Sequence, residues 1–108
     1  MSLEITHISS LIAGCCKNDR NCQRELYHRL YDYALKITYR YVTLTEEAEE
    51  LTNESFMKLY RNIKTFDANR PGEIEALLKG WFKKILINTA IDHLRKHQLK
   101  LVLTFKLF

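Results

Sequence analysis

Apolar side chains recur every three or four positions in the first part of the chain, the spacing of amphipathic helices. The first such run covers residues 5–16 and predicts a helix with one buried face. Asn18 or Asp19 can cap a second helix, because both side chains accept hydrogen bonds from free backbone N–H groups. The periodicity of this second helix ends near Tyr41.

Two further helices are predicted on either side of one loop. Thr45 is positioned to cap the third helix, whose apolar stripe reaches Ile63. Turn-forming residues then interrupt the pattern over 65–72. The stripe resumes at Glu73 and continues to about Leu94, enough for a helix of about 25 residues. The stripes place these residues in the core: Leu26, Leu30, Ala34, Ile37, Leu51, Phe56, Leu59, Leu77, Leu78, Trp81, Phe82 and Ile85.

The last ten residues follow a different period. From Leu99 onward, every second position is Leu or Phe, which predicts a strand without a partner. Such a segment is either a frayed, disordered end or a piece docked onto this or a second molecule. We therefore expect a helical domain over 1–98 and a tail over 99–108.

The composition supports this outline. A chain of 108 residues and 12.9 kDa is expected to form one core. Three glycines and one proline supply too few turns for a many-stranded fold. The predicted class is all-α, a compact bundle of about four helices.

Several kinds of function are disfavoured. The sequence has no apolar stretch of the ~18 residues that a membrane span requires, and no signal peptide is visible, so we expect a cytoplasmic protein. Cys15, Cys16 and Cys22 are odd in number and lack the spacing of a zinc site. No phosphate-binding loop, metalloprotease motif or nucleophile with a base is present, so we expect neither an enzyme nor a cofactor or metal.

Charge is divided between two segments. Residues 44–64 carry five acidic and three basic side chains, whereas 73–100 carry six basic and three acidic ones. The acidic segment could meet a basic protein surface and the basic one could meet phosphate. The alternative is that both are solvated helix faces.

Two sequence blocks give the pattern a specific meaning. Residues 48–60, AEELTNESFMKLY, resemble the A-E-D-L-x-Q-E-x-F-x-x-x-[WY] stretch of bacterial sigma factors of the extracytoplasmic-function (ECF) group. Residues 81–96, WFKKILINTAIDHLRK, are similar to that group's W-[LF]-x-x-I-x-x-N-x-x-[IL]-D-x-x-R-[KR] block. The resemblance spans roughly residues 8–97 and covers the region-two domain of the group.

The resemblance implies a helical bundle that binds the clamp helices of RNA polymerase core and reads the promoter's minus-ten element as single-stranded DNA. Glu50, Asn53 and Glu54 match its clamp-facing polar positions, and Met57 and Tyr60 lie near the same surface. Carboxylates and an amide one turn apart can pair with arginines of a partner helix.

The resemblance also assigns the DNA contacts. The loop from 65 to 72 corresponds to a specificity loop that holds a flipped-out base, with Asn69 and Arg70 as candidates. The fourth helix would follow the backbone and place an amide near the bases, through Lys79, Lys83, Asn88, Arg95 and Lys96.

The chain departs from the group at several positions. Glu50 stands where Asp is usual and Asn53 where Gln is usual, so the reach of each side chain changes by one methylene. Leu86 and Ile87 replace small and polar or basic residues, which removes one expected DNA contact. Complete members also carry a second DNA-binding domain for the minus-thirty-five element, which this sequence does not include.

Two alternatives remain at the sequence level. The chain could be a helical interaction module without DNA binding, whose acidic helix binds a regulator such as an anti-sigma factor. Individual residues also have purely structural interpretations: Trp81 as core, and Asn88, Asp92 and Arg95 as an internal polar network. A duplex-reading helix-turn-helix is disfavoured by the long apolar stripe of the fourth helix.

Overall fold

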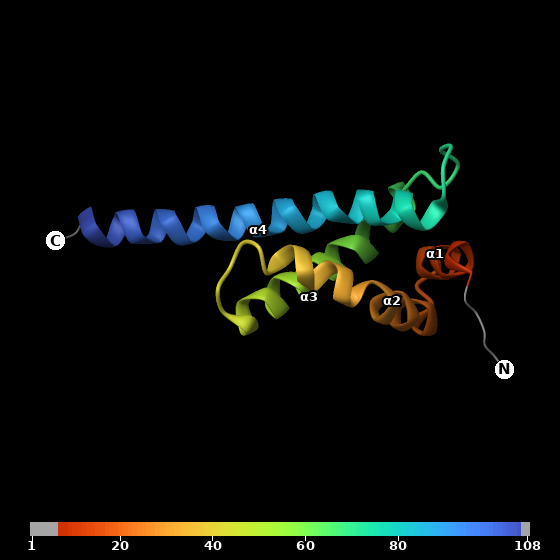
Figure 1. The fold of residues 1–108 in the computed structure, drawn as a ribbon, viewed down its shortest axis with the longest axis horizontal. Coiled ribbons are helices and arrows are strands. Elements are labelled where there is room, and N and C mark those ends of the chain that lie inside the picture. The colour runs from red at the N-terminus through yellow and green to blue at the C-terminus, as the bar shows by residue number, and fades with distance from the viewer. Residues whose placement is uncertain (1–6, 107–108) are drawn as a thin grey trace.

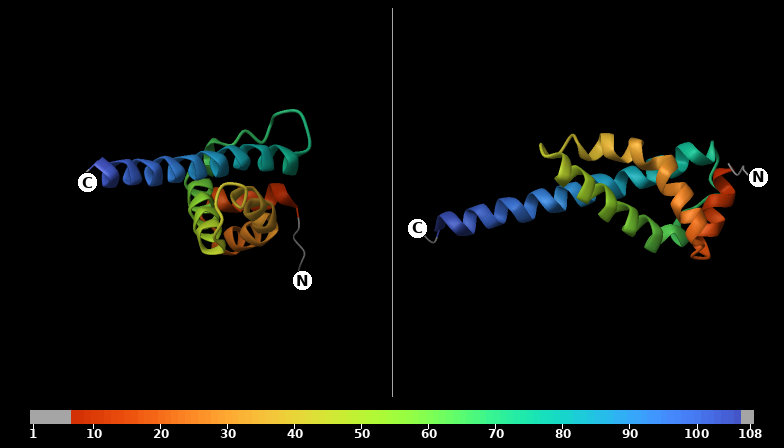
Figure 2. Two further views of the ribbon diagram at one scale, coloured as in Figure 1. Left: turned by 60° about the vertical axis from the view of Figure 1, so that its left-hand side comes forward. Right: turned by 90° about the horizontal axis from the view of Figure 1, so that it is seen from below.

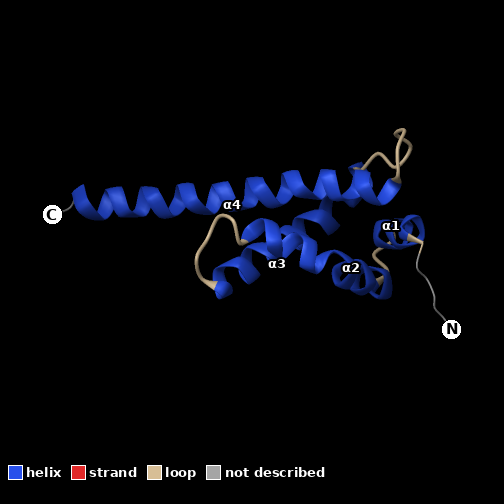
Figure 3. Cartoon of the chain, viewed as in Figure 1, coloured by secondary structure: helices blue, strands red, loops and turns tan. Residues whose placement is uncertain are grey.

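The computed structural model describes residues 7–106 of the 108, and over that range the chain is made of helices joined by turns (Figure 3). The helices of these described residues are α1 (Ile8–Cys16), α2 (Arg20–Thr38), α3 (Thr45–Asn62), the 3₁₀ turn η1 (Ile63–Thr65) and α4 (Ile74–Lys106). No strand occurs among residues 7–106, which confirms the all-α class. Residues 5 and 6 of the first predicted helix and the last two residues of the tail lie outside the described part.

The three shorter helices lie against one side of α4, which runs along the whole molecule (Figures 1 and 2). The 33 residues of α4 extend about 50 Å at 1.5 Å per residue. Its last turns therefore project past the other helices, and the molecule measures 61 × 28 × 22 Å.

The core forms where α2, α3 and α4 meet, and it confirms most of the predicted stripes. Phe56 of α3 packs on Phe82 of α4 with ring centroids 4.8 Å apart, and on Tyr27 of α2 at 4.7 Å. Burying each large apolar side chain stabilises the fold by about 1.5–3 kcal/mol. The largest fully buried apolar side chains are Phe56, Phe82, Leu26, Leu30, Leu59, Ile63, Leu78 and Leu86.

Three helix ends refine the predicted boundaries. Asp19 caps α2, since its Oδ1 accepts hydrogen bonds from the backbone N–H groups of Asn21 and Cys22 at 2.9 and 3.2 Å. The helix ends at Thr38 rather than Tyr41, because the last N–H groups bond three residues back in tighter turns. The prediction that Thr45 caps α3 is wrong: Thr45 is the first helical residue and Leu44 occupies the cap position.

The fourth helix is longer than predicted. It begins at Ile74, where the Glu73 carboxylate accepts a hydrogen bond from the N–H of Ala76 at 3.1 Å, and it continues through residue 98 without a break. The strand predicted from the alternation after Leu99 is wrong, because residues 99–106 are helical. A helix bonds its backbone groups internally, whereas a lone strand leaves them without protein partners.

No helix among the described residues combines the length and the hydropathy that crossing a membrane needs.

Candidate protein-binding ridge and nucleic-acid interface

Four of the predicted polymerase-binding residues share one exposed face of α3. Glu50, Asn53, Glu54 and Met57 follow the i, i+3, i+4, i+7 spacing of a single helix face, and all four side chains are exposed. Met57 is 62% exposed. We call these four residues the acidic ridge. Its surface is open to an approaching molecule.

Hydrogen bonds and an ion pair fix the ridge to its neighbours. The Tyr27 hydroxyl donates to Oδ1 of Asn53 at 2.7 Å. Glu54 lies 3.6 Å from Nζ of Lys58, and the same ammonium group donates to the Thr89 hydroxyl of α4 at 3.0 Å. Tyr27 of α2 thus contacts the ridge directly, and Thr89 of α4 contacts it through Lys58.

Buried hydroxyl groups lock the opposite face of α3 onto α2. Thr38 and Thr52 share a hydrogen bond of 2.9 Å, and both side chains are fully buried. The Thr38 hydroxyl also contacts the Ala48 carbonyl at 3.2 Å. These bonds satisfy polar groups inside the core, so they set how α3 is rotated and which of its residues face outward.

The fifth predicted polymerase-binding residue, Tyr60, has a different environment. Its ring is half-buried and its hydroxyl donates to the Gln23 carbonyl of α2 at 2.7 Å. Burial raises the pKa of the Tyr60 phenol well above its usual value. Tyr60 therefore lies beside the ridge, in the packed interface between α2 and α3.

The loop before α4 is shaped by local turn chemistry. Asp67 Oδ1 accepts a hydrogen bond from the Asn69 N–H at 2.9 Å, which closes an Asx turn. Gly72 has φ +127°, a conformation that L side chains rarely adopt. Phe66 anchors the start of the loop on Trp81 with ring centroids 5.4 Å apart. Asn69 and Arg70 both project from this loop and are exposed.

A hollow of about 250 Å³ lies between this loop and the start of α4. Its lining combines cationic, aromatic, aliphatic and small residues: Arg70, Ala76, Leu77, Gly80, Trp81 and Lys84. Trp81 is half-buried, so its ring contributes both to the core and to the wall of this hollow.

The hollow includes a residue that the sequence interpretation did not single out. Lys84 lies one turn after Trp81 and joins Arg70 at the hollow. Its place in the series Leu77, Gly80 and Lys84, with steps of three and four residues, is the signal that could have identified it.

Asn88 and Arg95 lie along the same outer side of α4 as Lys84. Asn88 follows Lys84 by one helical turn and Arg95 follows by two more, and all three are exposed. Asp92 is also exposed in this region. The hollow therefore opens onto a line of polar groups that is mainly but not wholly basic.

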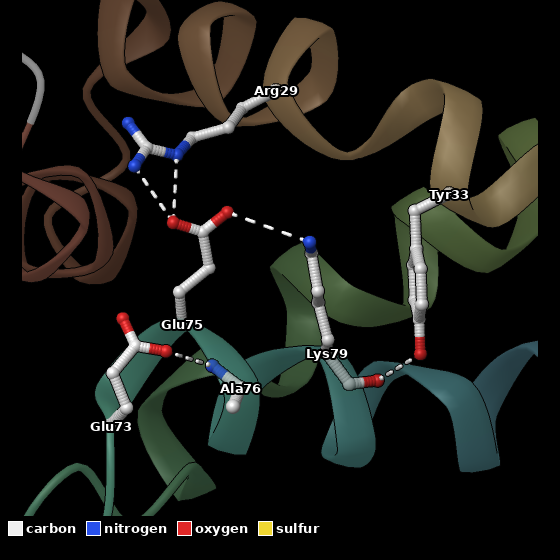
Figure 4. Close-up of polar contacts among 6 residues, drawn as sticks. All are labelled: Arg29, Tyr33, Glu73, Glu75, Ala76 and Lys79. Carbon is white, nitrogen blue, oxygen red and sulfur yellow. Dashed lines mark hydrogen bonds and ion pairs between the residues drawn. The ribbon is translucent and has the colours of Figure 1, made fainter.

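Lys79 points to another side of α4, toward α2 (Figure 4). Glu75 accepts hydrogen bonds from Nε and Nη2 of Arg29 at 3.2 and 2.7 Å, and its other oxygen lies 3.8 Å from Nζ of Lys79. The Tyr33 hydroxyl donates to the Lys79 carbonyl at 3.0 Å. The bond from Arg29 holds the pKa of the Glu75 carboxyl below its usual value. Lys79 thus takes part in the contact between α2 and α4.

The remaining two predicted DNA contacts are separated from the hollow. Lys83 is exposed one turn beyond Lys79, on the same side of α4. Lys96 lies on the projecting part of α4, beside His93, His97 and Lys100. The structure therefore brings Arg70, Asn88 and Arg95 to one side of the molecule. The three predicted lysines lie elsewhere, Lys79 and Lys83 on a second side and Lys96 on a third.

The cysteines belong to the α1–α2 corner. Cys15 is buried, and burial raises the pKa of its thiol to about 12. A Cβ at Gly14 would overlap Sγ of Cys22, so glycine allows the two helices to approach closely. Among the described residues, no group of three His, Cys, Asp or Glu side chains could hold a metal ion.

Comparison with known proteins places this geometry in context. The model of the family "Sigma-70 region 2" matches residues 26–100, which include the ridge, the loop and most of α4. The chain is 30% identical over 80 residues to the ECF RNA polymerase sigma factor SigW of Bacillus subtilis (strain 168). That alignment covers 74% of this chain and 40% of the relative, so the matched segment spans two fifths of the length of that protein.

Proposed function

Because the chain belongs to the sigma-70 region 2 family and is of the ECF type, we propose that it binds core RNA polymerase through the acidic ridge and engages the opened minus-ten element of a promoter through the hollow. The observation that carries this proposal is the separation of the two surfaces. The ridge lies on α3, and the hollow lies at the loop and the start of α4.

The chemistry of the ridge suits a basic helical partner. Glu50 and Glu54 can accept charge-assisted hydrogen bonds from arginine or lysine, which are about twice as strong as neutral ones. Oδ1 of Asn53 is already bonded to Tyr27, so the N–H groups of its amide are directed to the partner. We propose that this partner is the clamp helices of the polymerase core. We also propose that the binding takes place in the cytoplasm.

The chemistry of the hollow suits one unstacked nucleotide. The Trp81 ring offers a stacking surface, and base–aromatic stacking contributes about 1–3 kcal/mol per base. Arg70 and Lys84 supply positive charge for the flanking phosphates. Asn69, exposed in the same loop, carries an amide that can bond the edge of a base.

Strand opening by this domain needs no covalent chemistry of its own. Binding of unpaired bases stabilises the open strand relative to the duplex, and the energy of binding is what shifts that equilibrium. This agrees with the family, whose members are initiation factors rather than enzymes.

Selection from a library of randomised single-stranded oligonucleotides tests the DNA-binding part of the proposal. We expect enrichment of a short motif, and tighter binding of the selected oligonucleotide than of its scrambled version in a fluorescence anisotropy titration. Affinity should fall as salt rises, with a slope of about −0.7 per phosphate contact. Equal affinity for both oligonucleotides would favour the alternative, an interaction module that binds a regulator such as an anti-sigma factor.

A further inference from the structure

The projecting part of α4 carries strong positive charge. Residues 93–106 include Arg95, Lys96, Lys100 and Lys106 and no acidic side chain. Leu99, Leu101, Val102 and Leu103 are 45–59% exposed on the same segment. Figures 1 and 2 show it extending beyond the three shorter helices. We call residues 93–106 the overhang.

One face of the overhang continues the buried stripe of α4. Leu78, Phe82 and Leu86 face the core, and the same helix face continues with His93, Lys96, His97 and Lys100 at the edge of the bundle and past it. These four side chains line a hollow of about 350 Å³. The stripe that is apolar inside the bundle is thus cationic where the bundle ends. We call these four residues the basic strip.

The strip already contacts one carboxylate of its own chain. Glu47 Oε2 lies 3.2 Å from Nε2 of His93. Tyr41, Val42 and Leu94 border this contact. An acidic helix face with apolar flanks therefore suits the strip.

The chain itself contains such a helix face. Residues 45–54 of α3 hold five glutamates and no basic side chain. Only Glu47 is directed to the strip of the same molecule, and Glu46, Glu49 and Glu50 are exposed. Leu44 and Met57 flank this acidic stretch and are 59% and 62% exposed.

The two segments are similar in length and opposite in charge. Residues 45–54 extend about 15 Å and residues 93–100 about 12 Å at 1.5 Å per residue. Leucines of the overhang can pack on Met57, which lies on the same face of α3 as Glu46 and Glu50, while the charges pair beside it.

We propose that two copies of this chain associate by laying the overhang of each across the acidic half of α3 of the other. An arrangement of this kind uses the same two surfaces on both copies and closes as a two-fold dimer. The glutamate–strip contact that forms within one molecule at Glu47 is then repeated between molecules.

A second copy fits this surface better than nucleic acid does. The strip is turned away from the DNA-facing hollow, since Lys84 and Lys100 are about 160° apart around the axis at 100° per residue. The exposed leucines beside the strip gain nothing from a phosphate backbone, whereas another helix buries them.

Sedimentation velocity of the full chain tests the proposal from about 1 to 200 μM at 50 and 500 mM salt. We expect a monomer–dimer equilibrium at low salt whose dissociation constant rises at least tenfold at high salt, because screening weakens charge pairing. Lys96→Glu with Lys100→Glu, or Glu46→Lys with Glu49→Lys, should each give a monomer. An equimolar mixture of the two double variants should form a heterodimer again.

Lys17→Glu with Lys64→Glu is the matched control, since both lysines are exposed outside the strip. This control should dimerise like the original chain. A monomer throughout the concentration range overturns the proposal, as does a dimer that neither charge reversal weakens or a mixture that stays monomeric. The proposal is also overturned if the chain is monomeric and the strip variants lose only binding to duplex DNA, or only binding to a Glu- and Leu-rich helical peptide. Either result would assign the strip to that ligand.

Discussion

The hydroxyl of Tyr27 on α2 donates a 2.7 Å hydrogen bond to Oδ1 of Asn53 on α3. Tyr27 also packs on Phe56 with ring centroids 4.7 Å apart, so one side chain joins the core to the acidic ridge. The orientation of an exposed amide is thereby set by the packing of two helices.

Removal of this hydroxyl tests whether the orientation matters. Tyr27→Phe keeps the ring against Phe56 and frees the Asn53 amide to rotate. We expect polymerase core to bind about 2- to 10-fold more weakly, the equivalent of one ordinary hydrogen bond. Tyr39→Phe, at the exposed tyrosine that directly follows α2, should not change the affinity. Equal affinities for Tyr27→Phe and the original chain, measured by fluorescence anisotropy, would show that the bond has no part in binding.

The contact between Arg29 and Glu75 predicts a pH-dependent stability. The pKa of Glu75 is lower in the folded chain than its usual 4.5, so its ion pair stabilises the fold above that pH and loses this effect as the pH falls through the folded pKa. Glu75→Gln should reduce the free energy of unfolding by about 1 kcal/mol at pH 7. In urea denaturation the difference should shrink as the pH falls below 4.5 and through the folded pKa of Glu75. A difference that persists in acid would exclude the ionised carboxylate as its source.

The buried hydroxyl pair of α2 and α3 gives a second stability prediction. Thr38→Val removes the bonds to Thr52 and to the Ala48 carbonyl and leaves buried polar atoms without partners. We expect a loss of about 1–3 kcal/mol. Thr38→Val combined with Thr52→Val should cost less than the two single changes added together, because the hydroxyls share one bond. Strict additivity in urea denaturation would show that the two groups act independently.

The sequence pattern was sufficient for the elements whose environment it encodes directly. Three apolar stripes, which contain Leu26, Phe56 and Phe82, indicated three helices with one buried face each. All three of these side chains are buried. Glu50 and Asn53 were singled out by the family resemblance rather than by this pattern, and both are exposed on α3.

The pattern was not sufficient where the structure depends on residues far apart in the sequence, or where one segment fits both a helical and a strand period. After Leu99 the alternation suggested a strand, but the preceding helix continues because its backbone bonds propagate from turn to turn. The place of Lys79 in the contact between α2 and α4 was not foreseen, because Arg29 and Glu75, 46 residues apart, meet beside it only in the fold. Its role at DNA stays a prediction. Lys84 was overlooked because the helical spacing that aligns it with Leu77 and Gly80 gains a meaning only when the folded loop brings Arg70 next to it.

The hollow beside the loop predicts a measurable salt effect. Arg70→Ala or Lys84→Gln should weaken binding of the selected single-stranded oligonucleotide and reduce the magnitude of the slope of log affinity against log salt by about 0.7. Lys17→Gln should leave both quantities unchanged, since this exposed lysine lies at the α1–α2 corner. Bound DNA should also quench the fluorescence of Trp81, the one tryptophan of the chain. An unaltered slope in both hollow variants would place the phosphates elsewhere.

The most direct measurement of the proposed function is the affinity of this chain for RNA polymerase core when the ridge is altered. Glu50→Lys combined with Asn53→Ala reverses one charge and removes the amide, and Glu25→Lys with Asn21→Ala makes the same changes at exposed positions of α2. We expect the ridge variant to bind at least tenfold more weakly, about 1.4 kcal/mol, and the α2 variant to bind like the original chain. Equal binding by all three proteins would contradict the assignment of the acidic ridge to the polymerase.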